Sequence, residues 1–468
     1  CPIDLVEEVM VMAELREDQK QIAERIIKLF KGNNIVALQA PTGWGKSFVA
    51  AAIIKELGGR WLWASSLISA LAAAGKALDE FGIKRYLSAG RERMCLKDYR
   101  NVDFILRRPC DKCQYNKQAP KDLVRALSTM PINDYGSLRA VAEENSLCPY
   151  VTQEQYVKTL LRTLDNIVML MNYKRLNKYV KYADGVVIDE AHNTVLPRLT
   201  TLQRRAVEQM LNRLGVVGVD ARNAEVVRGV LSEHLLTIAM DEGINELVGL
   251  EDVVGFVESQ VVYYDIAEDA LVGVKVEGLP DLRGRRAIIM SATLPPSLMR
   301  VVPTIMAQPT QVIRAKIGDI AVTAENIERL RSQIVNRLRD LISGEPTLIF
   351  STSSKEVVLD DVAYEDELRP EDLCRKSVML RFYGRFSEGT RLNCYRRVVL
   401  LTLPLLPPNV MARLEGRGVR SVDVVVTKTV QAIGRALPQE GLEVFLFDKR
   451  YKQYCSELAN YGIQCIED

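Results

Sequence analysis

Short apolar runs recur along this chain, and most of them precede a segment that suits a helix. A helical pattern spans about Arg16 to Lys31, with apolar residues at Ile22, Ile26, Ile27 and Phe30. Runs with the pattern of buried strands lie at 34–38, 61–64, 166–171, 185–188 and 287–290, and later at 347–350, 398–401 and 444–447. This alternation predicts an α/β protein with two parallel sheets and with ligand contacts at the strand ends.

Two stretches interrupt the alternation. From Arg91 to Arg125 the chain has ten Lys or Arg against five Asp or Glu. Residues 197–281 are predicted to be mostly helical, and the acidic run from Asp241 to Glu258 is interpreted as a solvated face. Parallel-sheet folds accept insertions in the loops at their strand ends, so both stretches are predicted to be inserted modules.

These patterns predict a division into two cores and two insertions. The first core takes 1–90, 151–196 and 282–312, and the second core takes 313–468. A cysteine-bearing module at 91–150 and a helical module at 197–281 interrupt the first core.

Composition agrees with a globular protein. Apolar residues make up 48% of the 468 positions and charged residues 26%, so sizeable cores can form. The net charge of +2 does not by itself indicate nucleic acid, and any basic surface must be local. No apolar run reaches the length of a membrane span and the first residues lack a signal-peptide pattern, which predicts a soluble intracellular protein without a membrane partner.

The segment from Ala40 to Ser47 lies between a predicted strand and a predicted helix, which is the context of a phosphate-binding loop. Its glycines, Gly43 and Gly45, let backbone N–H groups turn toward a phosphate, Lys46 can reach the outer phosphates and Ser47 can hold Mg²⁺. Ala40 stands where the usual pattern has its first glycine. The loop predicts a site for a nucleoside triphosphate.

Two carboxylates, Asp189 and Glu190, end a predicted buried strand. Hydrolysis of ATP requires one carboxylate that fixes Mg²⁺ and another that orients and deprotonates the attacking water, so we assign Asp189 to the metal and Glu190 to the water. In the second core, Arg435 is a candidate for the arginine that meets the developing negative charge.

Four cysteines, Cys95, Cys110, Cys113 and Cys148, gather in the first inserted module. Their spacing indicates that four thiolates can meet at one metal centre, and it leaves iron–sulfur, zinc and no metal open. The module is also basic and carries Tyr99, Tyr115 and Tyr150, which suits phosphate contacts and base stacking. Four later cysteines are predicted to be buried small residues: Cys374, Cys394, Cys455 and Cys465.

Taken in order, these motifs resemble those of the superfamily 2 helicases, and the cysteine-bearing insertion is similar to that of the XPD family. The resemblance is carried by Ala40–Ser47, Asp189–His192, Ser291–Leu294, Phe386–Gly389 and Gln431–Arg435, and also by Cys148–Tyr150, Asn172–Tyr173 and Asp448–Tyr451.

The resemblance implies an α/β fold with two RecA-like parallel-sheet motor domains, an inserted iron–sulfur module and an inserted helical arch. It implies a [4Fe–4S] cluster on the four cysteines of the first module, together with ATP and Mg²⁺ as cofactors. It also implies 5′ to 3′ translocation on single-stranded DNA, unwinding at a fork or duplex junction, and DNA-repair proteins as partners. Arg91 stands at a position where the family has a basic residue close to the cluster and to the DNA.

The site residues that follow from the motifs and the resemblance fall into three groups. Catalytic roles are expected for Lys46, Asp189, Glu190, Gln431 and Arg435. Nucleotide contacts are expected for Arg16, Gln19, Ala40, Thr42, Gly43, Gly45, Lys46, Ser47 and His192. Metal contacts are expected for Cys95, Cys110, Cys113 and Cys148 at the cluster, and for Ser47 and Asp189 at Mg²⁺.

Departures from the family pattern lie in the second core. Arg391 stands where the family has an acidic residue, Pro438 stands where it has a second arginine, and the stretch from Gly389 to Gln431 is short. Two alternatives to a DNA helicase therefore stay open. One is an ATP-binding nucleic-acid subunit with weak or no unwinding, and the other is an RNA-directed motor with a zinc module.

Overall fold

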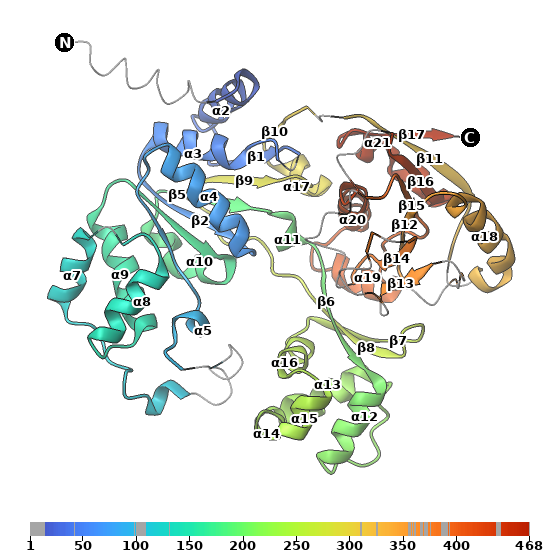
Figure 1. The fold of residues 1–468 in the computed structure, drawn as a ribbon, viewed down its shortest axis with the longest axis horizontal. Coiled ribbons are helices and arrows are strands. Elements are labelled where there is room, and N and C mark those ends of the chain that lie inside the picture. Colours follow the sequence, from blue (N-terminus) through green and yellow to red (C-terminus); the bar gives the residue numbers. More distant parts are fainter. Residues whose placement is uncertain are drawn as a thin grey trace. The chain divides into compact units, whose positions relative to one another are not determined.

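The computed structural model describes residues 15–41, 43–97, 99, 109–130, 132–308, 311–323, 326–353, 357, 359, 362–365, 368, 373–374, 376–384, 392, 394–436 and 441–467. The chain divides into two compact units, which Figure 1 shows as ribbons coloured along the sequence. The first unit takes Cys1–Thr194, Glu277–Leu294 and Leu298–Gln308, and the second takes Val195–Val276, Pro295–Ser297 and Pro309–Asp468. Within the described ranges, no helix is both long enough and apolar enough to cross a membrane.

A parallel sheet forms the centre of the first unit. Among the described residues it has seven strands, and the five runs predicted as strands in this part of the chain are confirmed. In spatial order the strands are β10 (Thr304–Met306), β1 (Ile35–Gln39), β9 (Arg286–Ser291), β5 (Gly185–Asp189), β2 (Arg60–Ser65), β4 (Ile167–Asn172) and β3 (Arg85–Leu87).

Helices cover both faces of this sheet (Figure 1). Alternate strand residues enter different cores: Trp61 and Trp63 of β2 face one core, whereas Leu62 and Ala64 face the other. Because both faces are buried, the strands are apolar along their whole length. The first core is shared with α2 (Glu17–Leu29), α3 (Lys46–Leu57) and α4 (Ile68–Glu80), and the second with α9 (Pro149–Thr163), α10 (Tyr173–Tyr179) and α17 (Pro296–Val301).

The cysteine-bearing stretch adds short helices to the first unit. They are α5 (Arg91–Met94), η1 (Pro109–Lys112), α7 (Lys121–Thr129) and α8 (Tyr135–Glu144). Leu127 and Leu138 pack into the core of α9, so this stretch is anchored to the sheet unit by apolar contacts. Two further short helices, η2 (Val180–Tyr182) and α11 (His192–Val195), flank β5 in sequence.

The second unit contains another parallel sheet, with seven strands among the described residues. The three predicted runs are confirmed as its central strands β12, β15 and β16. In spatial order the strands are β13 (Ala363–Tyr364), β14 (Val378–Arg381), β12 (Thr347–Ser351), β15 (Arg397–Leu400), β16 (Glu443–Asp448), β11 (Ile313–Ile320) and β17 (Ile463–Glu467).

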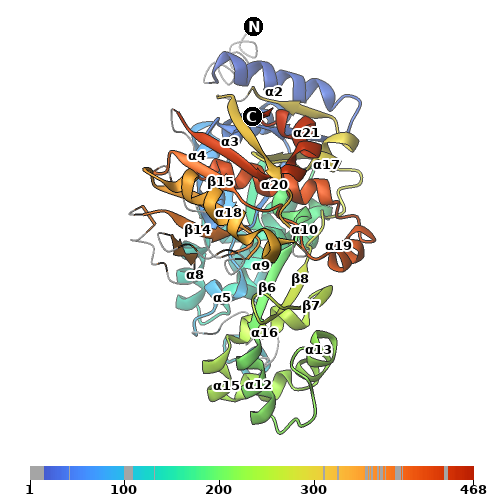
Figure 2. The same cartoon turned by 90° about the vertical axis from the view of Figure 1, so that its right-hand side faces the viewer.

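Helices on the two faces of this sheet bury different sets of strand residues. Leu348 and Phe350 of β12 pack with α20 (Ser421–Gly434) and α21 (Cys455–Ala459), whereas Ile349 packs with α18 (Ile327–Ile342). Figure 2 gives the view from the α18 side. In the part of the chain that the structure describes, the remaining helices outside the insertion are α19 (Pro408–Glu415) and η5 (Lys449–Tyr454).

The insertion between β5 and β9 is only partly helical. Besides its helices it contains an antiparallel three-stranded sheet, which the prediction of a mostly helical module missed. Its elements are β6 (Arg198–Gln203), α12 (Arg204–Arg213), α13 (Ala224–Glu233), α14 (Leu235–Met240), α15 (Glu242–Leu247), α16 (Leu250–Val257), β7 (Val261–Asp265) and β8 (Ala270–Lys275).

This insertion belongs to the second compact unit. Val261, Val272 and Val274 of its hairpin share one apolar core with residues of α19 and α20, among them Val410 and Val424. At the tip of the hairpin the buried Glu268 accepts hydrogen bonds from Ser353 Oγ at 2.5 Å and from Arg381 Nη1 at 3.2 Å. Apolar and ionic contacts together join the insertion to the second sheet.

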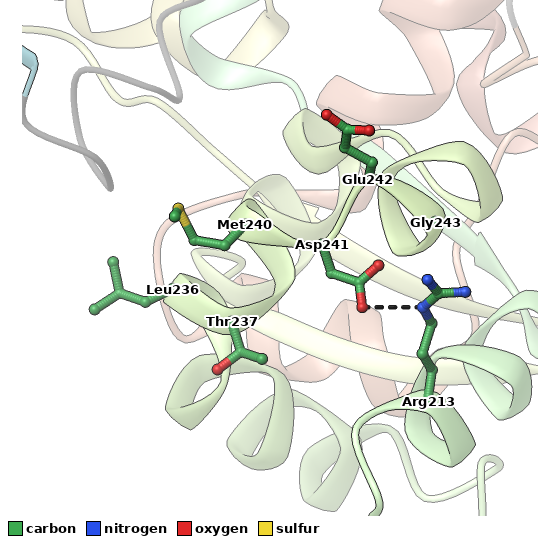
Figure 3. A pocket seen from close by; sticks show the side chains of 7 residues that line it. All are labelled: Arg213, Leu236, Thr237, Met240, Asp241, Glu242 and Gly243. Atoms are coloured by element: carbon green, nitrogen blue, oxygen red, sulfur yellow. Dashed lines mark hydrogen bonds and ion pairs between the residues drawn. The ribbon is translucent and has the colours of Figure 1, made fainter.

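A shallow hollow of about 780 Å³ lies on the insertion (Figure 3). Arg213 Nε donates to Asp241 Oδ2 at 2.9 Å beside it, and Leu236 and Met240 are largely exposed at its edge. None of the residues predicted for a functional site lines this hollow.

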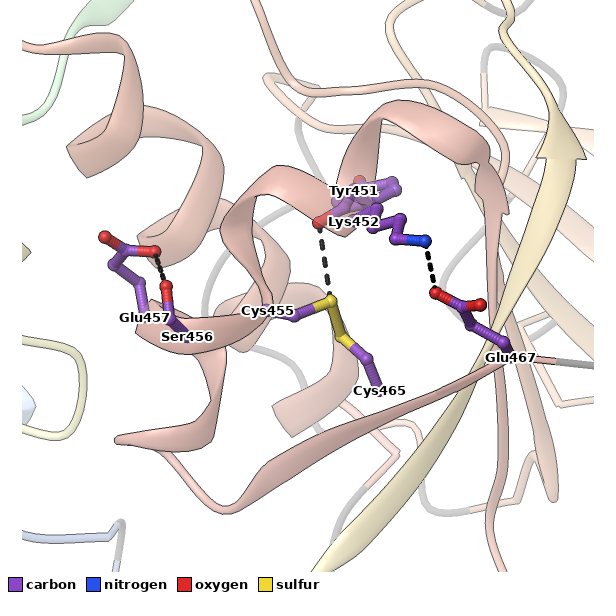
Figure 4. The surroundings of a disulfide bond; sticks show 7 residues. All are labelled: Tyr451, Lys452, Cys455, Ser456, Glu457, Cys465 and Glu467. Carbon is purple, nitrogen blue, oxygen red and sulfur yellow. Dashed lines mark hydrogen bonds and ion pairs between the residues drawn. A yellow bond between two sulfur atoms is a disulfide. The ribbon is translucent and has the colours of Figure 1, made fainter.

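The prediction for the four later cysteines was wrong. Cys374 pairs with Cys394, and Cys455 pairs with Cys465 as Figure 4 shows, so these residues form two disulfides. None of them is buried, and their Cα atoms lie 5.7 and 5.8 Å apart, which is within disulfide reach. Sequence spacing cannot reveal such pairs, because η5 and α21 must first fold back toward β17.

Candidate functional site

The phosphate-binding loop connects the end of β1 to the start of α3. Gly43 and Gly45 have positive φ angles of 82° and 103°, a conformation that glycine adopts without steric cost. Lys46 Nζ donates to the carbonyl of Ala40 at 3.1 Å and to that of Pro41 at 3.4 Å. The lysine thus lies folded over its own loop, in the place from which it can exchange carbonyl partners for a phosphate. Thr42 lies outside the described residues.

Arg16 and Gln19, at the start of α2, both contact this loop. Arg16 Nη2 donates to the carbonyl of Trp44 at 2.9 Å, and Gln19 Nε2 donates to the same oxygen at 2.7 Å. A side chain at Gly45 would collide with Gln19, since its Cβ would lie 2.4 Å from Nε2. These two residues therefore support the loop's conformation in this structure, a contact that the sequence pattern did not indicate.

Asp189 and Glu190 stand at the carboxyl end of β5, a central strand of the first sheet. Burial, together with the neighbouring Glu190 carboxylate, raises the pKa of Asp189 to about 6, although Lys46 acts in the opposite direction. Glu190 has a φ of +51°, a strained conformation of the kind that occurs at functional sites. Two adjacent carboxylates, one of them buried, form a donor set that suits a divalent cation.

His192 connects the acidic pair to the end of β9. Its Nδ1 lies 2.8 Å from Ser291 Oγ and 3.3 Å from Glu190 Oε2. The backbone N–H of Ala40 in turn donates to the Ser291 carbonyl at 3.2 Å. Residues separated by about 250 positions are thereby brought to one edge of the first sheet, because β1, β9 and β5 are neighbours in it.

The predicted residues of the second unit lie near the end of α20. Arg435 caps this helix and is buried, and its carbonyl accepts the N–H of Leu392 at 2.7 Å. Gln431 lies one turn earlier and is half-buried. The motif Phe386–Gly389 and the departures Arg391 and Pro438 lie outside the described residues.

The four cysteines of the first module are partly exposed and form no disulfide. Burial raises the pKa of the Cys110 thiol and that of Cys148, and in both cases the charges of neighbouring cysteines add to the effect. Cys110 is therefore close enough to the other three thiols for their charges to act on it. In the described part of the chain, however, no group of three or more Cys, His, Asp or Glu side chains is arranged to hold a metal ion.

A cluster of cations surrounds Tyr150, next to the last of these cysteines. The ring centre lies 4.8 Å from the Arg91 guanidinium, 5.7 Å from Lys178 Nζ and 5.9 Å from the Arg175 guanidinium. Arg175 also pairs with the buried Glu154 at 2.8 Å. Cation–π contacts thus hold the start of the cysteine-bearing stretch against α9 and α10.

Two contacts to Asp189 were missed by sequence reasoning. The Tyr173 hydroxyl donates to the Asp189 carbonyl, and Trp63 Nε1 donates to Asp189 Oδ2 at 3.4 Å. The sequence signals for Tyr173 were its place after a strand end and its membership of the Asn172–Tyr173 motif, but neither predicted this contact. For Trp63 there was none, since a tryptophan in an apolar run is usually a core residue.

Comparisons with known proteins agree with this geometry. A family model described as the res subunit of type III restriction enzymes matches residues 12–61, which include the loop. The ATP-dependent DNA helicase XPD of Sulfolobus acidocaldarius is 22% identical over 285 residues, 57% of this chain and 49% of that protein. The chain thus matches about half the length of this curated relative.

Two solved structures share the fold across most of the chain. Xpd4 of S. tokodaii superposes with a TM-score of 0.53 at 17% identity, covering 96% of this chain and all of that one. An XPD structure in its apo form superposes with a TM-score of 0.57 at 17% identity, with the same coverage.

Proposed function

Because the chain is homologous to the XPD helicases, we propose that it is an ATP-dependent DNA helicase that hydrolyses ATP at the carboxyl edge of its first sheet. The observation that supports this most is the meeting of Lys46, the Asp189–Glu190 pair and His192 with Ser291 at that edge. The loop, the acidic pair with its histidine, and Ser291 come from three separate segments and converge on one place.

In this proposal each group at the edge has a role set by its chemistry. Backbone N–H groups around Gly43 and Gly45, with the start of α3, bind the phosphates, and Lys46 leaves its carbonyl partners for the outer phosphates. Glu190 orients the attacking water and takes its proton. His192 holds Glu190 against Ser291, so that the carboxylate keeps its direction.

Asp189 and Ser47 would hold Mg²⁺. The residues fit this ion, because the Asp189 carboxylate is crowded by Glu190 and by burial, and a cation relieves both. When bound, Mg²⁺ neutralises charge on the phosphates. We propose Arg435 and Gln431 as the contribution of the second unit to hydrolysis, and Arg435 as the arginine that stabilises the developing charge.

The proposed substrate is single-stranded DNA, entered at a fork or duplex junction and followed from 5′ to 3′, with a role in repair. The support is homology, since the curated relative is a DNA helicase. Arg91, Lys178 and Tyr150 add a local basic and aromatic surface on the first unit.

We also propose that Cys95, Cys110, Cys113 and Cys148 hold a [4Fe–4S] cluster. Homology to the XPD helicase supports this assignment, as do the four thiols, which form no disulfide. Iron and sulfide counts after anaerobic purification test it, together with the visible spectrum. A colourless protein containing zinc would favour the RNA-directed motor instead.

Replacing Glu190 with Gln tests the hydrolytic role. We expect ATP turnover stimulated by single-stranded DNA in the wild type and a loss of at least about 100-fold in Glu190→Gln, with ATP still bound. Glu208→Gln, a change in the insertion, is the matched control. If the wild type binds ATP and DNA but Glu190→Gln loses nothing, the protein is an ATP-binding nucleic-acid subunit rather than a helicase.

A further inference from the structure

We infer that Trp63 is a positioning residue of the nucleotide site, which fixes the orientation of the Asp189 carboxylate through its indole N–H. This inference deepens the proposed function and rests on it, because it concerns the carboxylate assigned to Mg²⁺. It adds a residue of β2 to a site otherwise made from the ends of β1, β5 and β9.

Strand register places Trp63 within reach of Asp189. β2 and β5 pair in parallel, with Trp61 opposite Gly185 and Trp63 opposite Val187. Asp189 lies two residues beyond Val187, about 7 Å further along the strand. The Trp63 indole extends in that direction, so its Nε1 lies 3.4 Å from Asp189 Oδ2.

Each oxygen of the Asp189 carboxylate therefore receives one directed donor. Oδ2 accepts from Trp63, and Oδ1 accepts from the backbone N–H of Glu190 at 3.0 Å. The hydroxyl of Tyr173 anchors the carbonyl of the same residue. Two donors on opposite oxygens fix the plane of the group, while each oxygen keeps a lone pair for a metal ion.

Burial makes the tryptophan contact important. Asp189 is only 5% exposed, and the Trp63 side chain is fully buried, so bulk solvent has little access to replace a lost donor. Partners of this kind that orient a metal ligand typically change metal affinity by about 10- to 100-fold when they are removed.

The chain supplies a matched control in Trp61. Trp61 and Trp63 lie on the same face of the same strand, and both side chains are fully buried in the core beneath α3 and α4. The indole N–H of Trp61 donates to the carbonyl of Gly58 at 2.8 Å, far along the strand from Asp189. Phenylalanine at either position removes an indole from the same core, but only position 63 loses a donor to the carboxylate.

The experiment measures the affinity of the full-length protein with ADP for Mn²⁺, by electron paramagnetic resonance. We expect Trp63→Phe to weaken Mn²⁺ binding about 10-fold and Trp61→Phe to stay within about 2-fold of the wild type. Asp189→Asn should abolish the difference between tryptophan and phenylalanine at position 63. Equal Mn²⁺ affinities for Trp63→Phe and Trp61→Phe would overturn the inference.

A second variant keeps the test decisive if Trp63→Phe does not fold. Replacing Trp63 with β-(3-benzothienyl)alanine keeps the size and shape of the ring and substitutes sulfur for the N–H, so packing is retained and only the donor is lost. We expect the same weakening as for phenylalanine, and unchanged Mn²⁺ affinity would refute the role. If the wild type itself binds ADP without any effect of Mn²⁺, the proposed function fails first.

Discussion

Asp189 shows how function conflicts with stability at a single residue. The carboxylate is buried beside Glu190, and its pKa of about 6 lies above the usual value of 3.8. In the metal-free protein, the Asp189 carboxyl is therefore harder to ionise in the folded state than in the unfolded state. Its ionisation lowers the free energy of unfolding. This loss of stability is absent below about pH 4 and reaches its full size above about pH 6.

Replacing Asp189 with Asn should therefore stabilise the first unit of the metal-free protein at pH 8. The expected gain is up to about 3 kcal/mol, because one pKa unit corresponds to about 1.36 kcal/mol and the shift is about two units. The gain should vanish as the pH falls toward 4, since the wild-type carboxyl is then neutral. Thermal unfolding in the presence of a chelator, at pH 8 and pH 4.5, measures both effects.

Asp184 provides a control of opposite sign on the same sheet. Its hydrogen bonds with Arg60, at 2.8 Å, hold its pKa below the usual value. Asp184→Asn should destabilise the protein at pH 8, and this loss should disappear as the pH falls through the lowered pKa of the wild-type carboxyl. A gain at pH 8 from both substitutions would contradict the assignment of the Asp189 effect to burial.

At the scale of elements, the disulfide between Cys455 and Cys465 ties α21 to β17. β17 pairs with β11 on one side only and lies at the edge of the second sheet. Replacing both cysteines with Ser should destabilise the second unit by about 2 to 3 kcal/mol, the effect expected for closing a loop of this length. Hydrogen exchange should then accelerate in β17 first.

Treatment with a reducing agent distinguishes the loss of the Cys455–Cys465 bond from any effect that the two serines have on packing. Under reducing conditions the wild-type protein and the double variant should have the same stability, because both then lack both disulfides. Reduction should destabilise the variant less than the wild type, by the contribution of the Cys455–Cys465 bond, because the variant loses only Cys374–Cys394. If reduction affects the variant as strongly as the wild type, the Cys455–Cys465 bond does not stabilise the edge.

Sequence patterns predicted the central strands well and the edge strands poorly. β5 and β12 are covered on both faces and are continuously apolar, so their runs stand out. β3 and β17 contain charged or polar residues, because an edge strand is only partly covered. β6 was also missed, since four of the six residues in Arg198–Gln203 are polar.

The residues of the candidate site also fall into two groups, those that the sequence predicts and those that it does not. The loop around Lys46 and the pair Asp189–Glu190 follow from local sequence, because a strand end and a short motif define them. The contacts of Trp63 with Asp189 and of Gln19 with Trp44 depend on strand register and on helix packing over 126 and 25 positions. Such contacts appear only after the fold is known.

At the scale of the whole molecule, Glu268 joins the insertion to the second sheet. Glu268→Ala removes an acceptor of Ser353 and a carboxylate partner of Arg381, while the buried Glu365 remains as another carboxylate partner. We expect a loss of about 2 to 3 kcal/mol in the stability of the second unit, with faster hydrogen exchange in the hairpin β7–β8.

Glu258→Gln is the matched control on the same insertion. Glu258 pairs with Lys275 at 3.0 Å, but both side chains are substantially exposed. Its loss should therefore cost no more than about 0.5 kcal/mol. Equal effects of the two substitutions would show that Glu268 does not stabilise the junction.

The insertion belongs to the second unit although the chain enters and leaves it from the first, and this limits how fragments of the protein can be cut. A fragment that ends at Gln308 keeps every described strand of the first sheet, yet it carries residues 195–276 without the α19 and α20 residues that cover their apolar hairpin. That fragment should aggregate through the uncovered surface. The Gly278 N–H donates to the Thr194 carbonyl at 2.7 Å, so the two ends of the insertion meet and a few glycines can replace it.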